Sequence, residues 1–273
     1  MHAAAEAYRP EKVVRLLAHL WGQATEFMET GKPAEALWVC QMGTTACIMQ
    51  QLNARAGDIR CLTLHQVVLP GQESGSGLPA CVYALNNGLP VPDLEIIPGH
   101  TKTFFDMNLK RFSLPAHEVP FMCFGTWLGA LAYTADYLGR PLQHYLFRQR
   151  VQGGNLQKSP AAFQSAAVTT RRLTAGFQKS LEQLSLYAGE ACHSFRTGGA
   201  VCLAASGHHA GQVSAELYQA QANSAFTYMA AHVPARMVGV PCMCCKKLWE
   251  DEPARKLMQA VSEIEQMIDA AHT

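Results

Sequence analysis

The stretch HSFRTGGA, residues 193–200, places His193 three residues before Arg196. A tyrosine, Tyr228, follows 32 residues after that arginine. Two further cations lie far upstream in the chain, Arg55 and Lys102. Two arginines, a histidine and a lysine can together hold and activate a phosphodiester, and a tyrosine can attack it. The set predicts covalent cleavage of a DNA strand without a metal.

A phosphodiester under attack by a side chain gathers negative charge on its nonbridging oxygens. Arginine suits this charge because its planar guanidinium donates two parallel hydrogen bonds and stays protonated at any physiological pH. Histidine adds a further donor or a base, and lysine can protonate the leaving 5′ oxygen. A phosphotyrosine diester conserves the energy of the broken bond, so the strand can be rejoined to another end without ATP. No cofactor is expected.

These residues resemble the tyrosine recombinases, or phage-type integrases, whose catalytic fold is shared with type IB topoisomerases. The stretch LNARAGDI at 52–59 looks like the first box of that family, with Asp58 as the acid that supports the site. The stretch HTKT at 100–103 looks like the β-hairpin that carries the catalytic lysine. Residues 193–200 match the second box, and the step to Tyr228 is the spacing expected of the nucleophile.

The resemblance covers roughly residues 8–235 and implies a role for each residue. Arg55 and Arg196 would clamp the scissile phosphate, and Lys102 would be the general acid. His193 would donate to the phosphate and help to deprotonate Tyr228. The resemblance also implies an α+β fold that is mostly helical with a small antiparallel sheet, duplex DNA as the partner, and assembly of several copies on it.

One departure from the family pattern lies nine residues before the tyrosine. The family has a histidine or tryptophan there that donates to the phosphate, whereas this chain has Gln219. The glutamine amide can also donate. Either Gln219 takes this role in a weakened site, or the local register is shifted and Tyr218 or Gln221 takes it.

A second departure is the interval of 47 residues from Arg55 to Lys102. It looks lengthened by the stretch 70–92, which is rich in glycine and proline. An inserted surface loop is expected there.

Each residue also has an ordinary structural alternative. A single H-x-x-R pattern arises often by chance. Arg55 could stabilise the negative end of a helix or pair with Asp58, and Lys102 could be a strand-edge lysine. Tyr228 could pack its ring in the core, in which case Tyr218 is the nearest rival. The shared order and spacing favours the catalytic interpretation over four separate coincidences.

Size and composition indicate a folded domain, alone or with an appendage. The chain has 273 residues, of which 49% are hydrophobic and 16% charged. No secretory signal is visible, and the longest uncharged apolar stretch, 121–133, is too short to span a bilayer. The ten cysteines are expected to be reduced thiols, many of them buried. An intracellular protein that acts with the DNA is expected, in the nucleus or the bacterial nucleoid.

Charge is distributed unevenly along the chain. No acidic residue lies between Asp136 and Glu182. Phosphate backbones attract such a cationic segment, although a solvated face that lacks carboxylates is the alternative. The candidate DNA-binding residues are Arg140, Arg148, Arg150, Lys158, Arg171 and Arg172, with Lys179 completing the segment.

Hydrophobic periodicity predicts a mostly helical chain with one strand-rich interruption. The first helix begins near Pro10 and is broken by Gly31-Lys32-Pro33. Further helices are predicted at 34–53, 117–138, 166–187, 193–206, 210–218, 222–232 and 253–271. Short extended segments are predicted at 63–69, 81–85 and 94–97.

The chain is divided into a catalytic domain at 1–235 and a cysteine-containing linker with an amphipathic helix at 236–273. The amino-terminal helical domain that closes the family's clamp around DNA is expected to be absent. The last helix has an apolar face made by Leu257, Val261, Ile264 and Ile268. By the resemblance this face docks on a neighbouring protomer; the alternative is that it folds back on its own domain.

The cysteines Cys242, Cys244 and Cys245 are predicted to form a turn and not a metal site, because no paired C-x-x-C or H-x-x-x-H partner is evident. The function expected from the whole pattern is a site-specific DNA recombinase or integrase of a mobile element. The alternative is a domesticated, catalytically impaired relative that keeps only DNA binding.

Overall fold

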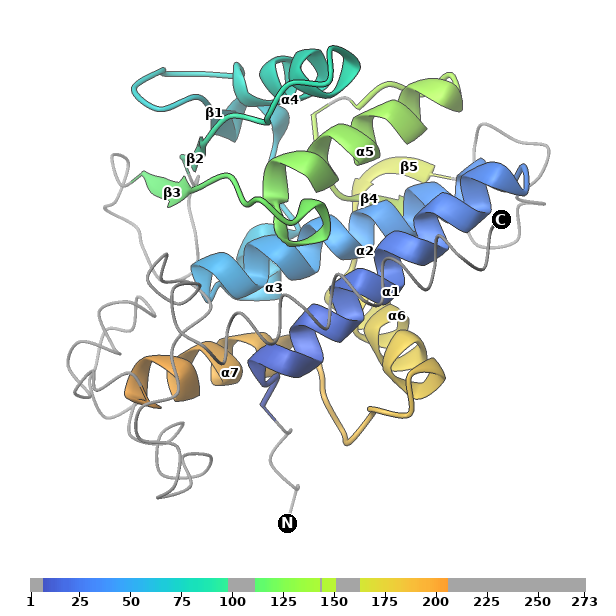
Figure 1. The fold of residues 1–273 in the computed structure, drawn as a ribbon, viewed down its shortest axis with the longest axis vertical. Helices are drawn as coiled ribbons and strands as arrows, with labels where there is room; N and C mark the ends of the chain where they lie inside the picture. Colours follow the sequence, from blue (N-terminus) through green and yellow to red (C-terminus); the bar gives the residue numbers. More distant parts are fainter. Residues whose placement is uncertain (1–6, 98–110, 143, 151–162, 206–273) are drawn as a thin grey trace.

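Most of the residues that the structure describes lie in helices (Figure 1). The computed structural model describes residues 7–97, 111–142, 144–150 and 163–205. Its α-helices are α1 (Pro10–Glu29), α2 (Pro33–Leu52), α3 (Ala56–Ile59), α4 (Gly77–Asn86), α5 (Phe124–Tyr137), α6 (Thr170–Gln183) and α7 (Cys192–Ala205). Two small antiparallel sheets accompany them. The expected α+β class, mostly helical, is confirmed.

The first two helices begin at prolines. Proline suits the first helical turn because a backbone N–H at that position would have no acceptor within the helix. Helix α1 has one apolar face, as predicted, and Gly31 with φ +69° separates it from α2. Helix α2 is buried on nearly every side, because α1, α5, α6 and α7 all pack against it. Figure 1 shows it crossing the middle of the molecule. It therefore forms the centre of the core.

A three-stranded sheet has the order β1-β2-β3. Strand β1 (Val67–Val68) pairs antiparallel with β2 (Leu94–Ile96), and β2 pairs antiparallel with β3 (Phe112–Leu114). The small antiparallel sheet is thus confirmed. Its third strand is not the predicted segment 81–85, because that segment belongs to α4.

The expected surface loop at 70–92 is wrong for the same reason. Helix α4 packs against α5, and its Cys81 is fully buried. A Cβ on Gly129 of α5 would overlap Leu85, so the two helices approach closely at a glycine. Most of the turn residues that suggested a loop flank a short helix, and Gly77 and Pro79 lie in its first turn. An apolar run of five residues cannot be assigned to strand or helix by its pattern alone.

A two-stranded hairpin was not predicted. Strand β4 (Arg148–Arg150) pairs antiparallel with β5 (Phe163–Ala167). The helix predicted from 166 therefore begins later, at Thr170, where the Thr169 hydroxyl accepts a hydrogen bond from the Arg172 N–H at 3.3 Å. Helix α5 likewise begins later than predicted, at Phe124 after a 3-10 turn at Pro120–Met122.

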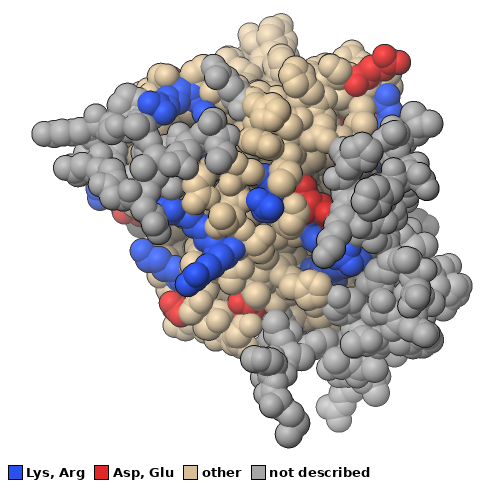
Figure 2. All heavy atoms as spheres, turned by 180° about the vertical axis from the view of Figure 1, so that it is seen from behind, with Lys and Arg blue, Asp and Glu red and all other residues tan. Residues whose placement is uncertain are grey.

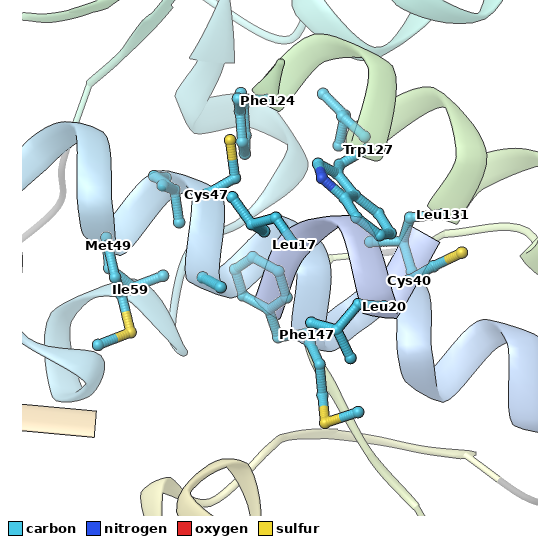
Figure 3. Packing of buried hydrophobic residues seen from close by; sticks show 14 of the residues in the cluster. Leu17, Leu20, Cys40, Cys47, Met49, Ile59, Phe124, Trp127, Leu131 and Phe147 are labelled. Carbon is cyan, nitrogen blue, oxygen red and sulfur yellow. The ribbon is translucent and has the colours of Figure 1, made fainter. Parts of the chain in front are cut away.

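Large aromatic side chains fill the core around α2. Trp127 of α5 is fully buried, donates from its indole N–H to the Phe121 carbonyl at 2.7 Å, and meets the ring of Trp21 edge to face at 4.9 Å. Figure 3 shows Trp127, Phe124 and Phe147 among aliphatic side chains of α1 and α2.

Six of the seven described cysteines are buried, which confirms that many are core thiols. Burial raises the pKa of Cys40 to about 12, so this thiol is a poor nucleophile. Among the described helices, none is both long and apolar enough to cross a membrane. The boundary predicted at 235, the helices predicted beyond 206 and the residues Cys242, Cys244 and Cys245 lie outside the described residues.

Candidate functional site

The H-x-x-R pattern lies at the start of α7. His193 is in the first turn and Arg196 lies three residues later, on the same face of the helix. The N–H of Ala191 donates to the Ser194 hydroxyl at 3.0 Å, and the N–H of Cys192 donates to the Thr174 hydroxyl at 3.4 Å. These bonds satisfy backbone groups at the helix start, where no intrahelical acceptor exists. The helix predicted at 193–206 is confirmed, apart from residue 206, which is not described.

The second arginine lies in the turn between α2 and α3. Helix α2 ends at Asn53, which has the left-handed conformation with φ 49° and ψ 31°. Arg55 is extended, with φ −77° and ψ 140°, and α3 begins at the next residue. Asp58 lies on α3. The family-like box at 52–59 therefore places its arginine just after one helix and just before the next.

A direct contact joins these two motifs. The Arg196 side chain is only 2% exposed, and its Nη1 donates to the Asn53 carbonyl at 3.1 Å across a separation of 143 residues. Gly199, one turn further along α7, lies against the same asparagine, since a Cβ there would overlap Asn53 Oδ1. The tertiary structure thus brings the start of α7 onto the end of α2.

The charges of Arg55 and Arg196 shift the pKa values of two other residues of the site, His193 and Asp58. Burial lowers the pKa of His193, and the charges of Arg196 and Arg55 lower it further. Burial raises the pKa of Asp58, while the same two arginines partly oppose that rise. Because Coulomb interactions fall with distance, two arginines that act on both groups indicate one cluster of four side chains.

The protonation states of this cluster follow from those shifts. With a pKa below its ordinary 6.5, His193 is neutral at pH 7 and can either accept or donate a proton. The residue is partly shielded by its neighbours and partly open to solvent. The two guanidinium groups stay charged at that pH. The cluster therefore combines two fixed cations, one of them buried, with a neutral imidazole.

The segment before α1 braces α7 from another side. The N–H of Tyr8 donates to the Ser194 carbonyl at 3.1 Å, and the Tyr8 ring stacks on Phe195 with centroids 4.0 Å apart. A Cβ on Gly198 would overlap the Tyr8 carbonyl, so this close approach also needs a glycine. The helix carrying His193 is consequently held by its neighbours in a defined position.

A buried ion pair lies just before α7. Lys12 of α1 donates to Glu190, which is itself buried, and the other oxygen of that carboxylate accepts from the Ala188 N–H at 2.7 Å. These bonds compensate the burial of the carboxylate. They also attach the loop that leads into α7 to the first helix.

Three predicted members of the site lie outside the described residues: Lys102, Gln219 and Tyr228. The two alternatives to Gln219, Tyr218 and Gln221, lie outside them as well. In the sequence, Lys102 falls between β2 and β3, which pair antiparallel. Within the described ranges, no three His, Cys, Asp or Glu side chains are grouped so that they could hold a metal ion.

The candidate DNA-binding arginines differ in their surroundings. Arg171 is exposed, whereas Arg172 is half-buried with its guanidinium 5.7 Å from the centre of the Trp38 ring. Arg148 is only 8% exposed, and its Nη2 donates to the Arg140 carbonyl at 2.9 Å. Arg148 therefore presents little surface to a phosphate in this arrangement, and Arg196, at 2% exposure, is buried more deeply still.

Arg140 is half-buried, and Lys158 and the side chain of Arg150 are not described. Figure 2 shows Lys and Arg side chains gathered in several groups on one face, with fewer Asp and Glu among them. The contribution of each basic residue to a DNA-binding surface stays a prediction.

Two residues of the site were not singled out from the sequence. Asn53 contacts Arg196 through its carbonyl, and an asparagine at the end of an apolar helix was the available signal, because asparagine tolerates the left-handed conformation. Tyr8 had no comparable signal, since an aromatic residue before a helix can pack in many ways.

Comparison with known proteins identifies no family: no protein-family model matches the chain, and no curated protein matches it at a significant level.

Proposed function

We propose that this chain is a DNA strand-breaking and rejoining enzyme of the tyrosine recombinase type, a site-specific recombinase or integrase of a mobile element. The observation that carries the proposal is the hydrogen bond from Arg196 to the Asn53 carbonyl. It joins two motifs that are far apart in the sequence and that the proposed chemistry needs together. The bond brings Arg196 beside the turn that carries Arg55, as the proposed chemistry requires.

The proposed reaction uses the described residues to bind and polarise a phosphodiester. Arg55 and Arg196 hold its nonbridging oxygens, where charge accumulates in the transition state. Neutral His193 accepts a proton or donates a hydrogen bond beside them. Burial, and after it the charges of the two arginines, lower the pKa of His193 and favour its neutral form.

The covalent step transfers the phosphoryl group to a tyrosine. The Tyr228 oxygen attacks phosphorus and loses its proton, the bond to the 5′ oxygen breaks, and Lys102 protonates that oxygen. A 3′-phosphotyrosine and a free 5′-hydroxyl result. Attack by a 5′-hydroxyl on the phosphotyrosine reverses the step and restores the phosphodiester, so neither ATP nor hydrolysis is required.

A second candidate is a relative that binds DNA but no longer cleaves it. The observation in its favour is Gln219, which stands where the family has a histidine or tryptophan. An amide can replace one hydrogen bond but not the bulk of an indole. The basic segment around Arg171 would then act in binding alone.

A cleavage assay with a nicked suicide duplex DNA distinguishes the two candidate functions. A preferred sequence is first selected from a pool of random duplexes with the full chain, and the nick then lets the 5′-hydroxyl fragment diffuse away after cleavage. A covalent protein–DNA adduct is expected with the wild-type chain and should be absent in Tyr228→Phe. Tyr133→Phe, at an exposed tyrosine of α5, is the control and should retain the adduct.

Other outcomes are equally informative. An adduct that is lost in Tyr218→Phe and kept in Tyr228→Phe would assign a different nucleophile. Sequence-selective binding without an adduct would favour the non-cleaving relative. The absence of both binding and adduct would contradict both candidates.

A further inference from the structure

We infer that Asn53 is the positioning residue that fixes the two arginines of the site, Arg55 and Arg196, relative to each other. Its backbone conformation directs the chain toward Arg55, and its carbonyl holds Arg196. This role deepens the proposed function and rests on it. Asn53 would not touch the DNA; it would act through the two guanidinium groups.

The backbone conformation of Asn53 is the first part of this role. Its φ of 49° lies in the left-handed region, which costs most residues about 1 kcal/mol or more and which asparagine tolerates better than other residues with a side chain. This conformation ends α2 and turns the chain, so that Arg55 follows two residues later at the start of α3. A residue that avoids positive φ would change the direction in which the chain leaves α2.

The carbonyl of Asn53 is the second part. It accepts a hydrogen bond from Arg196 Nη1 at 3.1 Å, and both residues are buried, with Asn53 6% exposed. A charged donor makes this bond stronger than one between neutral groups. Because a carbonyl is neutral, this contact orients the guanidinium without cancelling its charge. The charge can then act on an anion.

The side chain of Asn53 shows how closely this turn approaches α7, while the positioning role rests on the backbone. Its Oδ1 lies against Gly199 of α7, where a Cβ would overlap it. Arg196 and Gly199 are three residues apart and therefore lie on one face of α7. One asparagine thus contacts this face at two points, through its carbonyl and through its side chain. A shift at residue 53 would be transmitted to Arg196 as well as to Arg55.

The test compares Asn53→Gly with Asn53→Ala. Glycine adopts positive φ freely and keeps the carbonyl, so the glycine variant should form the suicide-substrate adduct at a rate within a few-fold of wild type. Alanine disfavours positive φ, and the resulting displacement of the arginines should slow adduct formation about 100-fold. Thermal melts of both variants establish that the rates are measured on folded protein.

A second measurement does not depend on DNA. The pKa of His193 is measured by NMR titration of its ring protons, assigned by their loss in His193→Gln. Asn53→Gly should leave this pKa where it is in the wild type. Asn53→Ala should move it up toward 6.5, because displaced arginines lower it less. A loss of stability alone would not produce this difference between the two variants.

The outcomes distinguish the inference from the proposed function. If the wild-type chain forms no adduct on its selected DNA, the proposed function fails, while the His193 titration still reports on Asn53. If the wild type is active and Asn53→Ala matches it in rate and in His193 pKa, the positioning role is wrong. A folded Asn53→Gly that loses the adduct would also overturn it, because the backbone conformation would then not be what matters.

Discussion

At the scale of single residues, the site combines one buried cation, Arg196, and one half-buried cation, Arg55, with a neutral histidine. Arg196 is almost fully buried yet is held by a backbone carbonyl, and His193 lies beside it at the surface. Burial and two nearby guanidinium groups act on the histidine in the same direction, since each disfavours its charged form. At Asp58, burial raises the pKa of the carboxyl group and the same two arginines lower it. The chemistry of the site therefore depends on small displacements of these charges.

The pH dependence of His193 follows from this arrangement. Its pKa in the folded chain lies below the ordinary 6.5, so the unfolded chain binds more protons between the two values. The contribution of His193 to the free energy of unfolding should therefore rise as the pH increases through that window. On the acid side, the rate of adduct formation should fall only when the pH drops below 6.5, where His193 gains its proton. A titration midpoint of His193 at or above 6.5 would contradict the structure.

Replacement of Arg196 by lysine should separate charge from geometry. Lysine keeps the positive charge but cannot donate from a planar fork, so the bond to the Asn53 carbonyl and the proposed bidentate hold on a phosphate should both be lost. The free energy of unfolding should fall by about 1 to 3 kcal/mol, and adduct formation should slow by a factor of about 100 or more. Denaturant unfolding and the suicide duplex measure these effects. Arg15→Lys, on the exposed side of α1, is the control and should change neither.

At the scale of secondary-structure elements, α7 is positioned by segments that precede it by more than 130 residues in the sequence. The end of α2 contacts it through Asn53, and the segment before α1 contacts it through Tyr8. Phe177 of α6 adds an edge-to-face contact with Phe195 at 5.4 Å. Helix α2 also packs against α1 and α5. Substitutions that change the packing of the core around α2 should therefore also change the position of α7.

Two substitutions at Tyr8 test how the segment before α1 holds α7. The ring is fully buried against Phe195, while its hydroxyl has no hydrogen-bond partner among the described residues. Tyr8→Phe should therefore leave the free energy of unfolding unchanged or raise it, because a buried hydroxyl without a partner is unfavourable. Tyr8→Ala should lower it by about 3 to 5 kcal/mol. Equal losses in the two variants, measured by denaturant unfolding, would show that the hydroxyl is bonded.

The crossing of α2 and α5 depends on Gly43. A Cβ there would overlap the indole of Trp127, so Gly43→Ala should lower the free energy of unfolding by about 1 to 3 kcal/mol. Gly22→Ala in α1 is the matched control, because the structure leaves open space around it. Alanine is the better helix former, so that variant should gain about 0.5 to 1 kcal/mol. Thermal or denaturant unfolding should move the two variants in opposite directions.

At the scale of the whole molecule, the proposed partner is a polyanion and the chain carries an unevenly distributed charge. The net charge is only +1, yet no acid lies between Asp136 and Glu182. The structure divides the basic residues of this segment into exposed ones, such as Arg171, and buried ones, such as Arg148. Affinity for DNA should come from the exposed group, because only exposed cations can displace counterions from phosphates.

The salt dependence of DNA binding tests this division. Arg171→Gln should weaken binding and reduce the slope of log K against log salt concentration by about 1, without changing stability. Arg148→Gln should mainly lower the free energy of unfolding, because it removes the bond to the Arg140 carbonyl. Fluorescence anisotropy with a labelled duplex at several salt concentrations gives the slopes. A larger change of slope for the folded Arg148→Gln than for Arg171→Gln would contradict the structure.

The sequence predicted the elements whose signals are local. Helices α1 and α2 follow from prolines at their starts and from Gly31 between them, and α7 was predicted around His193. The predictions failed where the signal was short or depended on distant partners. Five apolar residues at 81–85 fit a strand as well as a helix, so their pattern does not identify α4. No local pattern identifies the β4–β5 pair, because strands are defined by their pairing.

By itself, the sequence determined the helical character of the chain, the position of the H-x-x-R pattern on a helix and the chemistry that its side chains can perform, because all of these depend on neighbouring residues. Only the tertiary structure decided that Arg196 meets Asn53, that both arginines act on His193, and that Arg148 is buried while Arg171 is exposed. Contacts across 143 residues depend on how α2 and α7 pack in the shared core, and no local pattern encodes that packing.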